Sequence, residues 1–503
     1  MGFSDPTEDE LEQVANNVPF KISSEELSSY RILVSGVIEE IERIQEIPEP
    51  QFSPNEYSSG RRGGYRPDPK NNPHNIWIRK CNIGGKDTGL MSGWNVGLKD
   101  NISLAGIKMT CGSRMMEGYI PDIDATVVDR ILDEGASIRG KLNMETFGYS
   151  ASSDLTDYGT VSNPHNEGHS VGGSSSGPAA AVAIDKVDLA LGTDQGGSIR
   201  IPAAWSGIVG CKATHGLIPY TGVFPIDMTL DHVGPLASSV EKIAIALEVL
   251  AGPDGLDHRQ NYQSDSKNYI DSVSNGVNNV TVGVLEEGFN NDVADPQICE
   301  AVMESLNDFC SANGSKESVS VSLHSEALPL EFAILGYGGM QLFDQGGNGT
   351  FHESFYDTNL IREFSYFCQE RAEELPPTVK ASWLASAYVH QNVRGELYGK
   401  AQNITRQMEQ EYNSLLQQVD VLAMPTVPFQ PFELNPQMKW DERVSRSLQP
   451  AVNTVPFNMT GHPAITVPCG TVDQNPVGIM FVADHFDEKT LLNVASAFES
   501  KLS

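Results

Sequence analysis

The sequence predicts an α/β fold for most of this chain of 503 residues. Helix-like and strand-like segments follow one another along the chain, for example at 124–135 and 137–142. This alternation is typical of a sheet that is covered by helices. A chain of this length can also bury a large hydrophobic core. We therefore expect a layered α/β body.

Near the N-terminus, apolar residues such as Leu33 and Val37 recur at helical spacing among acidic residues. This spacing predicts two short helices, which would form an extension over residues 1–47. Residues 48–73 are rich in proline, glycine and arginine, and are expected to form a linker. The remaining chain, 74–503, would form the catalytic body.

Within this body, residues from about 328 to 398 are helical in pattern and rich in aromatic side chains. We expect this region to cover the substrate pocket. Packing of the aromatic rings into the core is the alternative interpretation.

The most informative chemistry lies in three short glycine-rich segments. They read G-L-K-D-N at 97–101, G-G-S-S-S-G at 172–177 and G-T-D-Q-G-G-S-I-R at 192–200. Glycine allows positive φ and lets backbone N–H groups approach a ligand closely, so such segments present their polar side chains to a ligand. Two serines and one lysine, with little other reactive chemistry nearby, favour acyl transfer.

The three reactive residues divide the work of acyl transfer in a consistent way. Ser198 would attack an amide carbonyl, Ser174 would pass the proton on, and Lys99 would receive it. Lys99 must then be neutral at working pH, which requires its pKa to fall by roughly 3 units from about 10.4. Burial among apolar neighbours can lower the pKa in this way, provided that Asp100 points away.

The loop around Ser198 also offers groups that could stabilise a developing oxyanion. The candidates are the backbone N–H groups of Gln195, Gly196, Gly197 and Ser198. Asp194 and Arg200 flank the nucleophile and are expected to brace its loop through hydrogen bonds or an ion pair. We further expect Phe147, Gly148 and Tyr149 to contribute to substrate binding.

In order and spacing, these segments resemble the amidase signature family of Ser-Ser-Lys hydrolases. Shorter matches are D-A-T-V-V at 124–128, G-K-L-N at 140–143, D-V-L-A-M-P-T at 420–426, T-G-H-P-A at 460–464 and P-V-G-I-M at 476–480. The stretches at 222–236 and 250–260 look most similar to free-standing bacterial amidases, which are often associated with nitrile metabolism.

The resemblance implies a large mixed β-sheet with helices on both faces and a cis peptide between Gly173 and Ser174. It implies hydrolysis of a small carboxamide without a metal or cofactor, and a homodimer formed through the N-terminal helices. Two positions depart from the family pattern: Ser176 replaces a frequent glycine, and Pro178 follows Gly177. If position 176 requires positive φ, serine would strain the loop.

Four alternatives compete with this interpretation. His232 follows Asp231 and could form a Ser-His-Asp triad with Ser198, although no G-x-S-x-G turn surrounds this serine. A phosphate-binding loop is disfavoured because Pro178 stands where such a loop requires lysine. The chain could instead be the glutaminase subunit of a tRNA-dependent amidotransferase, or a catalytically silent scaffold of the same fold.

The charge of the chain is strongly acidic, with 66 Asp and Glu against 34 Lys and Arg and a formal net charge of −32. Because the acids are dispersed, they self-repel unless counterions screen them, which favours a halophilic archaeal source over an ordinary acidic protein. The same charge disfavours nucleic-acid binding.

The sequence shows no signal peptide and no membrane span, so we expect a cytoplasmic enzyme. Its seven cysteines have no metal-ligand spacing and are expected to be free thiols.

Overall fold

The computed structural model describes residues 5–50, 61, 63–260, 268–273, 276–277 and 279–502. These residues divide into two compact units, Met1–Ser53 and Pro54–Ser503. Each unit is described by itself.

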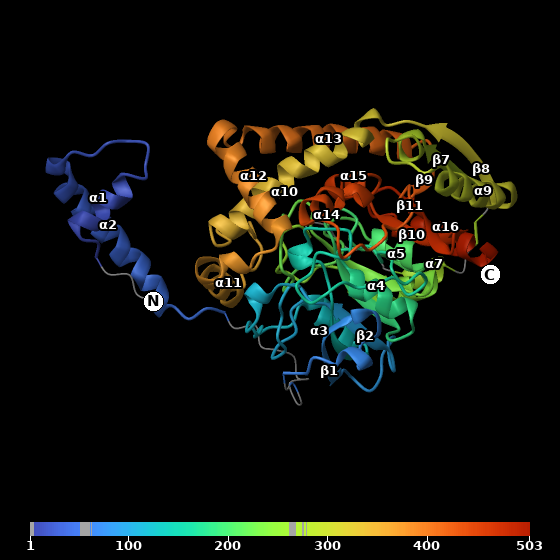
Figure 1. Ribbon diagram of the computed structural model, residues 1–503, viewed down its shortest axis with the longest axis horizontal. Helices are drawn as coiled ribbons and strands as arrows, with labels where there is room; N and C mark the ends of the chain where they lie inside the picture. Colours follow the sequence, from blue (N-terminus) through green and yellow to red (C-terminus); the bar gives the residue numbers. More distant parts are fainter. Residues whose placement is uncertain are drawn as a thin grey trace. The chain divides into compact units, whose positions relative to one another are not determined.

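The N-terminal unit contains two helices, α1 (Glu8–Ala15) and α2 (Ser24–Glu42), followed by the short η1 (Arg43–Glu46). Figure 1 draws them in dark blue. Each helix begins with a capping box, in which the hydroxyl of Thr7 or Ser23 accepts a backbone N–H and a glutamate three residues later accepts the N–H of the cap. The two short helices expected from the apolar spacing are present.

The second unit is built on a mixed sheet of eleven strands, in the order β1-β3-β2-β4-β6-β5-β10-β11-β9-β7-β8. The strands are β1 (Trp77–Gly84), β2 (Asn95–Lys99), β3 (Ser137–Leu142), β4 (Leu189–Asp194), β5 (Val209–Lys212), β6 (His232–Ala237), β7 (Val280–Leu285), β8 (Gly314–Val319), β9 (Val421–Pro425), β10 (Ala464–Val472) and β11 (Asn475–Val482). Strand β2 runs parallel to β3 and β4, and β7 runs parallel to β8 and β9, whereas the other pairs are antiparallel. The α/β class and the mixed sheet are confirmed.

Helices cover both faces of this sheet, because its strands bury side chains on both sides. One core cluster includes α3 (Thr126–Asp133), α6 (Val240–Leu250), α7 (Tyr269–Ser272), α9 (Pro296–Asn313) and α16 (Glu488–Leu502). The opposite clusters include α4 (Ser176–Ala183), α5 (Arg200–Ser206), α10 (Ala327–Asp344), α13 (Glu396–Leu416) and α15 (Val455–Met459). Along β4, Leu189 and Leu191 enter the first cluster and Ala190 enters the second, as strand alternation requires.

The predicted cover region is helical. Its helices α10, α11 (Thr358–Glu370) and α12 (Pro377–Val393) precede α13, and α10 packs against both α12 and α13 (Figure 1). Part of its aromatic set is core, since Phe343 and Phe364 are buried together with Phe224. These rings fit the alternative interpretation, in which aromatic side chains of the region pack into the core.

The remaining elements are short and lie mostly in connections. They are α8 (Glu286–Phe289), α14 (Trp440–Arg446), η3 (Pro69–Asn71), η4 (Pro73–Asn75), η5 (Arg114–Met116), η6 (Thr146–Gly148), η7 (Ser322–Glu326), η8 (Ala372–Glu374) and η9 (Gln449–Ala451). None of the helices in the described ranges is long and apolar enough to cross a bilayer.

The predicted linker, 48–73, falls partly at positions 51–60 and 62, which lie outside the described residues. The described residues that follow, from Arg61 on, pack within the second unit. The Arg61 guanidinium forms a bidentate ion pair with the Asp124 carboxylate at 2.5 Å. The backbones of Tyr65 and Lys80 exchange two hydrogen bonds. These contacts fix the chain before residue 74, so the body begins earlier than the composition alone indicates.

Candidate functional site

The sheet brings the lysine segment and the second serine segment together. Lys99 is the last residue of β2, and Asp194 is the last residue of β4. These strands are parallel neighbours, with Leu98 opposite Leu191. Both segments therefore leave the sheet at the same edge, where open α/β sheets place their ligands.

The Lys99 side chain is fully buried at this edge. Its Nζ lies 2.7 Å from Ser174 Oγ, 2.8 Å from Thr193 Oγ1 and 3.2 Å from the Thr193 carbonyl oxygen. Burial lowers the pKa of Lys99 from 10.5 to about 7, although the charges of Asp194 and Glu145 oppose this shift. A lysine with this pKa is largely neutral just above neutral pH and can accept a proton.

Asp100, the neighbour that had to point away, does so. Its carboxylate accepts hydrogen bonds from the backbone N–H and the hydroxyl of Thr110. It also faces the ammonium group of Lys141, whose Nζ lies 3.9 Å from Asp100 Oδ1. Asp100 therefore leaves Lys99 free to deprotonate.

The first serine segment turns directly into helix α4. The Gly173–Ser174 peptide is cis, as the family resemblance implies. Ser176 is the first residue of α4 and does not have positive φ, so the strain considered for this position is absent. Pro178 stands in the first turn of the helix, where its missing N–H breaks no hydrogen bond.

The loop that carries Ser198 is braced from within, as expected. Arg200 and Asp194 are both fully buried, and their side chains meet at 3.0 and 3.1 Å. Although burial opposes ionisation, the Arg200 guanidinium and the hydrogen bonds from Asn458 and Ile199 hold the pKa of Asp194 well below its usual range. The carboxylate stays charged and anchors the loop.

One predicted oxyanion donor is engaged elsewhere. The Gly197 N–H donates to Asp194 Oδ1 at 2.6 Å, because the loop curls around this carboxylate. The N–H groups of Gln195, Gly196 and Ser198 have no acceptor in the described part of the chain. These three remain as candidates to stabilise an oxyanion.

A cavity of about 550 Å³ opens beside Ser198. Gly148 and Tyr149 line it, as expected, together with Gln195 and Gly196. The prediction for Phe147 is wrong, because its buried ring packs in an aromatic cluster instead of lining the cavity. The rings within 6.0 Å of it, measured between centroids, are Phe224, Phe343 and Phe364.

Much of the cavity wall comes from the helices of the cover region, with α10 and α12 supplying apolar side chains. The apolar lining residues include Ile201, Ile226, Phe332, Leu335, Val389 and Leu397. One carboxyl group, that of Glu331, lies among them. The cavity can hold an apolar group of aromatic size.

His232 is not placed to act as a general base for Ser198. Its Nδ1 lies 2.7 Å from the Leu230 carbonyl oxygen and its Nε2 lies 3.3 Å from Lys212 Nζ. The Asp231 carboxylate accepts hydrogen bonds from the Gln195 side chain and the Ile226 N–H instead of from His232. Since burial also holds the pKa of His232 well below 6.5, this residue is a packed histidine and no Ser-His-Asp triad forms.

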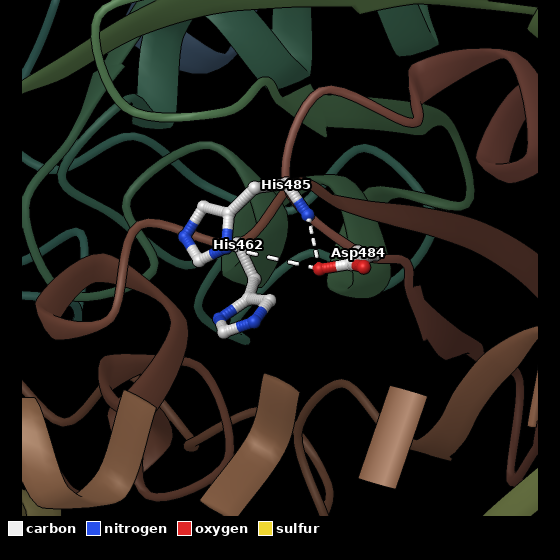
Figure 2. Close-up of side chains that lie close together, drawn as sticks. All are labelled: His462, Asp484 and His485. Atoms are coloured by element: carbon white, nitrogen blue, oxygen red, sulfur yellow. Dashed lines mark hydrogen bonds and ion pairs between the residues drawn. The ribbon is translucent and has the colours of Figure 1, made fainter. Parts of the chain in front are cut away.

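Three potential metal ligands, His462, Asp484 and His485, lie close together (Figure 2). Both ring nitrogens of His462 already have partners, with Thr460 Oγ1 at 2.9 Å and Asn413 Oδ1 at 2.8 Å. The two imidazole rings pack against each other, with centroids 3.9 Å apart and planes tilted by 38°. Because a ligating nitrogen must point its lone pair at the metal, we interpret this group as packing.

Sequence reasoning missed two residues of the site. Thr193 stands inside the glycine-rich segment at 192–200, and both its carbonyl oxygen and its hydroxyl contact Lys99. A hydroxyl in that segment could have been predicted as part of the site. Glu331 comes from a helix with an apolar pattern, and only the folded chain places it beside Gly196.

Comparison with known proteins agrees with this geometry. The model of the Amidase family matches residues 78–492. An enantioselective amidase of Rhodococcus rhodochrous is 38% identical over 439 residues, which cover 86% of this chain and 84% of the relative. A glutamyl-tRNA(Gln) amidotransferase subunit of Haloarcula marismortui is 35% identical over 435 residues, covering 84% and 99%. The crystal structure of the corresponding Thermotoga maritima protein aligns with a TM-score of 0.72 at 27% identity, covering 85% of this chain and 88% of that one.

Proposed function

Because this chain belongs to the amidase signature family, whose members hydrolyse amide C–N bonds, we propose that it converts small apolar carboxamides to carboxylate and ammonia. The proposal assigns the nucleophile to Ser198 and the proton relay to Ser174 and Lys99. It is supported by the 2.7 Å contact between Lys99 Nζ and Ser174 Oγ, and by the position of Ser198 in the cavity wall.

In the proposed reaction, Ser198 Oγ forms a bond to the amide carbon while its proton passes to Ser174 Oγ. The proton of Ser174 passes to Lys99 Nζ, which becomes an ammonium. The carbonyl oxygen gains negative charge and is stabilised by the free N–H groups of the 195–198 loop. The relay then returns the proton to the amide nitrogen, the C–N bond breaks, and ammonia leaves.

Water completes the cycle by attacking the Ser198 ester. Its proton follows the same route to Lys99 and returns to Ser198 Oγ as the acid is released. The presence of all three residues, with Lys99 in contact with Ser174 and Ser198 in the cavity wall, supports this activity over the alternative of a silent scaffold.

The observation that carries the choice of substrate is the chemistry of the cavity wall. Its lining residues in the described ranges include no arginine, lysine or histidine, and most are apolar. Free glutamine carries an α-carboxylate, which would meet no cation there and would be costly to bury. An apolar acyl group would instead gain roughly 25 cal/mol per Å² of its buried surface.

The competing function is that of the glutaminase subunit of a tRNA-dependent amidotransferase, because several relatives carry the name of an amidotransferase subunit. An ammonia-release assay on the purified single chain separates the two. We expect hydrolysis of benzamide and phenylacetamide and little release from glutamine. Glutamine turnover that requires the addition of partner subunits would favour the amidotransferase.

A homodimer through the N-terminal unit is also part of the proposal. Its helix α2 exposes several large apolar side chains, including Ile32 (74% exposed), Leu33 (66%) and Val37 (59%). A second copy of the same helices would bury this face. Light scattering should show a dimer for the natural chain and a monomer for Leu33→Glu/Val37→Glu. A mass unchanged by the double substitution would contradict this interface.

The cellular conditions and the metabolic role of the enzyme are also part of the proposal. The acidic composition and the haloarchaeal relatives support a salt-adapted cytoplasmic protein. The resemblance of 222–236 and 250–260 to free-standing amidases supports a place in nitrile metabolism. Growth of the source organism on a nitrile, with and without this gene, would test that place.

A further inference from the structure

Glu331 is a carboxyl group in the wall of an otherwise mostly apolar cavity. It projects from α10 and is 2% exposed. A Cβ added to Gly196 would lie only 2.3 Å from Glu331 Oε1, so the carboxyl lies directly against the loop that carries Ser198. Glu331 and Gly196 therefore lie side by side in the wall of the cavity that Ser198 also lines.

One oxygen of this carboxyl is buried and unpaired. Glu331 Oε2 makes no hydrogen bond with any residue in the described ranges. Leaving a buried polar atom unpaired destabilises the folded chain. The neighbouring α10 residues in the wall, Phe332 and Leu335, are apolar and carry no such cost. A carboxyl group without a hydrogen-bond partner in the wall of a binding site is explained if a bound ligand supplies one.

The protonation state of Glu331 restricts that partner. Burial raises the pKa of Glu331 to about 8, and the charge of Asp194 adds to the effect while Arg200 opposes it. At neutral pH the group is therefore a carboxylic acid, which donates through one oxygen and accepts through the other. A hydroxyl, which can both donate and accept, is complementary to it.

We propose that Glu331 is a positioning residue that binds a hydroxyl on the carbon next to the scissile carbonyl, so that 2-hydroxy carboxamides are preferred substrates. This inference rests on the proposed amidase function. The carbonyl oxygen would be held by N–H groups of the 195–198 loop, and Glu331 lies beside Gly196 of that loop. On this assignment, Glu331 would meet the substituent on the adjacent carbon.

The test compares two substrates that differ by one hydroxyl, mandelamide and phenylacetamide. For the natural enzyme we expect kcat/KM to favour mandelamide about tenfold, the size of one hydrogen bond of about 1.4 kcal/mol. Glu331→Leu should abolish this preference, because leucine offers no polar atom. Glu331→Gln should retain most of it, because the amide also donates and accepts.

The pH dependence of this ratio gives a readout that a purely structural role would not produce. Above pH 8, Glu331 ionises, and a bound hydroxyl stabilises the carboxylate by donating to it. Phenylacetamide leaves the charge unpaired near the developing oxyanion, so the preference for mandelamide should increase. The other ionised groups facing Glu331, Asp194 and Arg200, stay charged throughout, and titration of Lys99 affects both substrates equally. In Glu331→Gln the ratio should not change with pH.

Binding measurements keep the inference falsifiable if turnover is lost. In a Ser198→Ala background, mandelamide should bind more tightly than phenylacetamide, and Glu331→Leu should remove the difference. Equal affinities in that background would overturn the inference. So would a Glu331→Leu enzyme that loses the same factor for both substrates. A natural enzyme that releases no ammonia from any amide contradicts the proposed function instead, and the affinity comparison still decides the role of Glu331.

Discussion

Among the buried lysines whose pKa is lowered, Lys99 and Lys212 make the sharpest comparison, because only Lys99 has the geometry of a reactive site. Lys99 and Lys212 are both fully buried, and burial lowers the pKa of each to about 7. Lys99 Nζ contacts the hydroxyls of Ser174 and Thr193. Lys212 Nζ contacts the carbonyl oxygens of His462 and Ala213 and the ring of His232.

The difference shows that a lowered pKa is not sufficient for catalysis. Carbonyl oxygens can only accept hydrogen bonds, so they cannot deliver a proton to Lys212. A hydroxyl can donate and accept at once, so Ser174 can pass a proton between Lys99 and a group in the cavity. Perturbed pKa values locate candidate sites, and the partner groups decide which candidate can react.

The largest expected effect comes from removing Ser198, the proposed nucleophile. Ser198→Ala should lower kcat by about 10⁶, the loss typical of a missing catalytic serine. Its melting temperature should stay close to that of the natural chain, since the change removes a single oxygen at the cavity wall. A fluorophosphonate should label Ser198 in the natural chain and nothing in the variant. Labelling of another residue, with activity retained, would remove Ser198 from the mechanism.

The next largest effect compares the two lysines directly. Lys99→Ala should lower kcat/KM for amides by about 10²–10⁴, the usual contribution of a general base. Esters should lose less, because an alkoxide leaving group needs less help from a proton than an amide nitrogen does. Lys212→Met should keep kcat/KM within a few fold of the natural value, and His232→Ala is a second control. A large loss in either control with full activity in Lys99→Ala would reverse the assignment.

The pH dependence of the rate sharpens the same contrast. Lys99 must be neutral to accept a proton, so kcat/KM should fall about tenfold per unit as the pH decreases below about 7. Because Lys212 titrates near the same pH without touching the relay, Lys212→Met should show the same acidic limb. If that limb disappeared in Lys212→Met, the pH dependence of the rate would arise from Lys212 and not from Lys99.

Stability should respond to both lysines alike. Between about pH 7 and 10.5 the unfolded chain holds a proton on each lysine and the folded chain does not, so each group makes stability increase with pH by up to about 1.4 kcal/mol per unit. Lys212→Met should lack the contribution of Lys212 to this pH dependence. As the pH falls towards 7, the variant should therefore lose less stability than the natural chain. Denaturant unfolding at several pH values measures this. Parallel curves would mean that Lys212 is charged in the fold.

The smallest effect on catalysis is expected from salt. Charges on the surface repel one another over about 30 Å at 0.01 M salt and over about 3 Å near 1 M. With a net charge of −32, the melting temperature should rise markedly in molar KCl. The acidic limb of the rate should stay near pH 7, since Lys99 is buried away from the ions. A melting temperature that is independent of KCl would indicate an ordinary acidic surface.

The sequence by itself determined the fold class, the two N-terminal helices and the candidate residues of the site. The N-terminal helices follow from the apolar spacing of residues such as Leu33 and Val37, and the candidates from the glycine segments around Lys99, Ser174 and Ser198. Both signals depend on neighbours within a few positions, so they can be read along the chain.

Tertiary structure alone decided what surrounds those residues. Four contacts depend on how the chain folds back on itself. Asp194 accepts the Gly197 N–H, and the Phe147 ring packs among other aromatic rings. Glu331 lies against Gly196, and Lys212 contacts a carbonyl oxygen instead of a hydroxyl. Burial and hydrogen-bond partners are supplied mainly by segments that are distant in the sequence. They set the pKa values and the shape of the cavity, which no local pattern encodes.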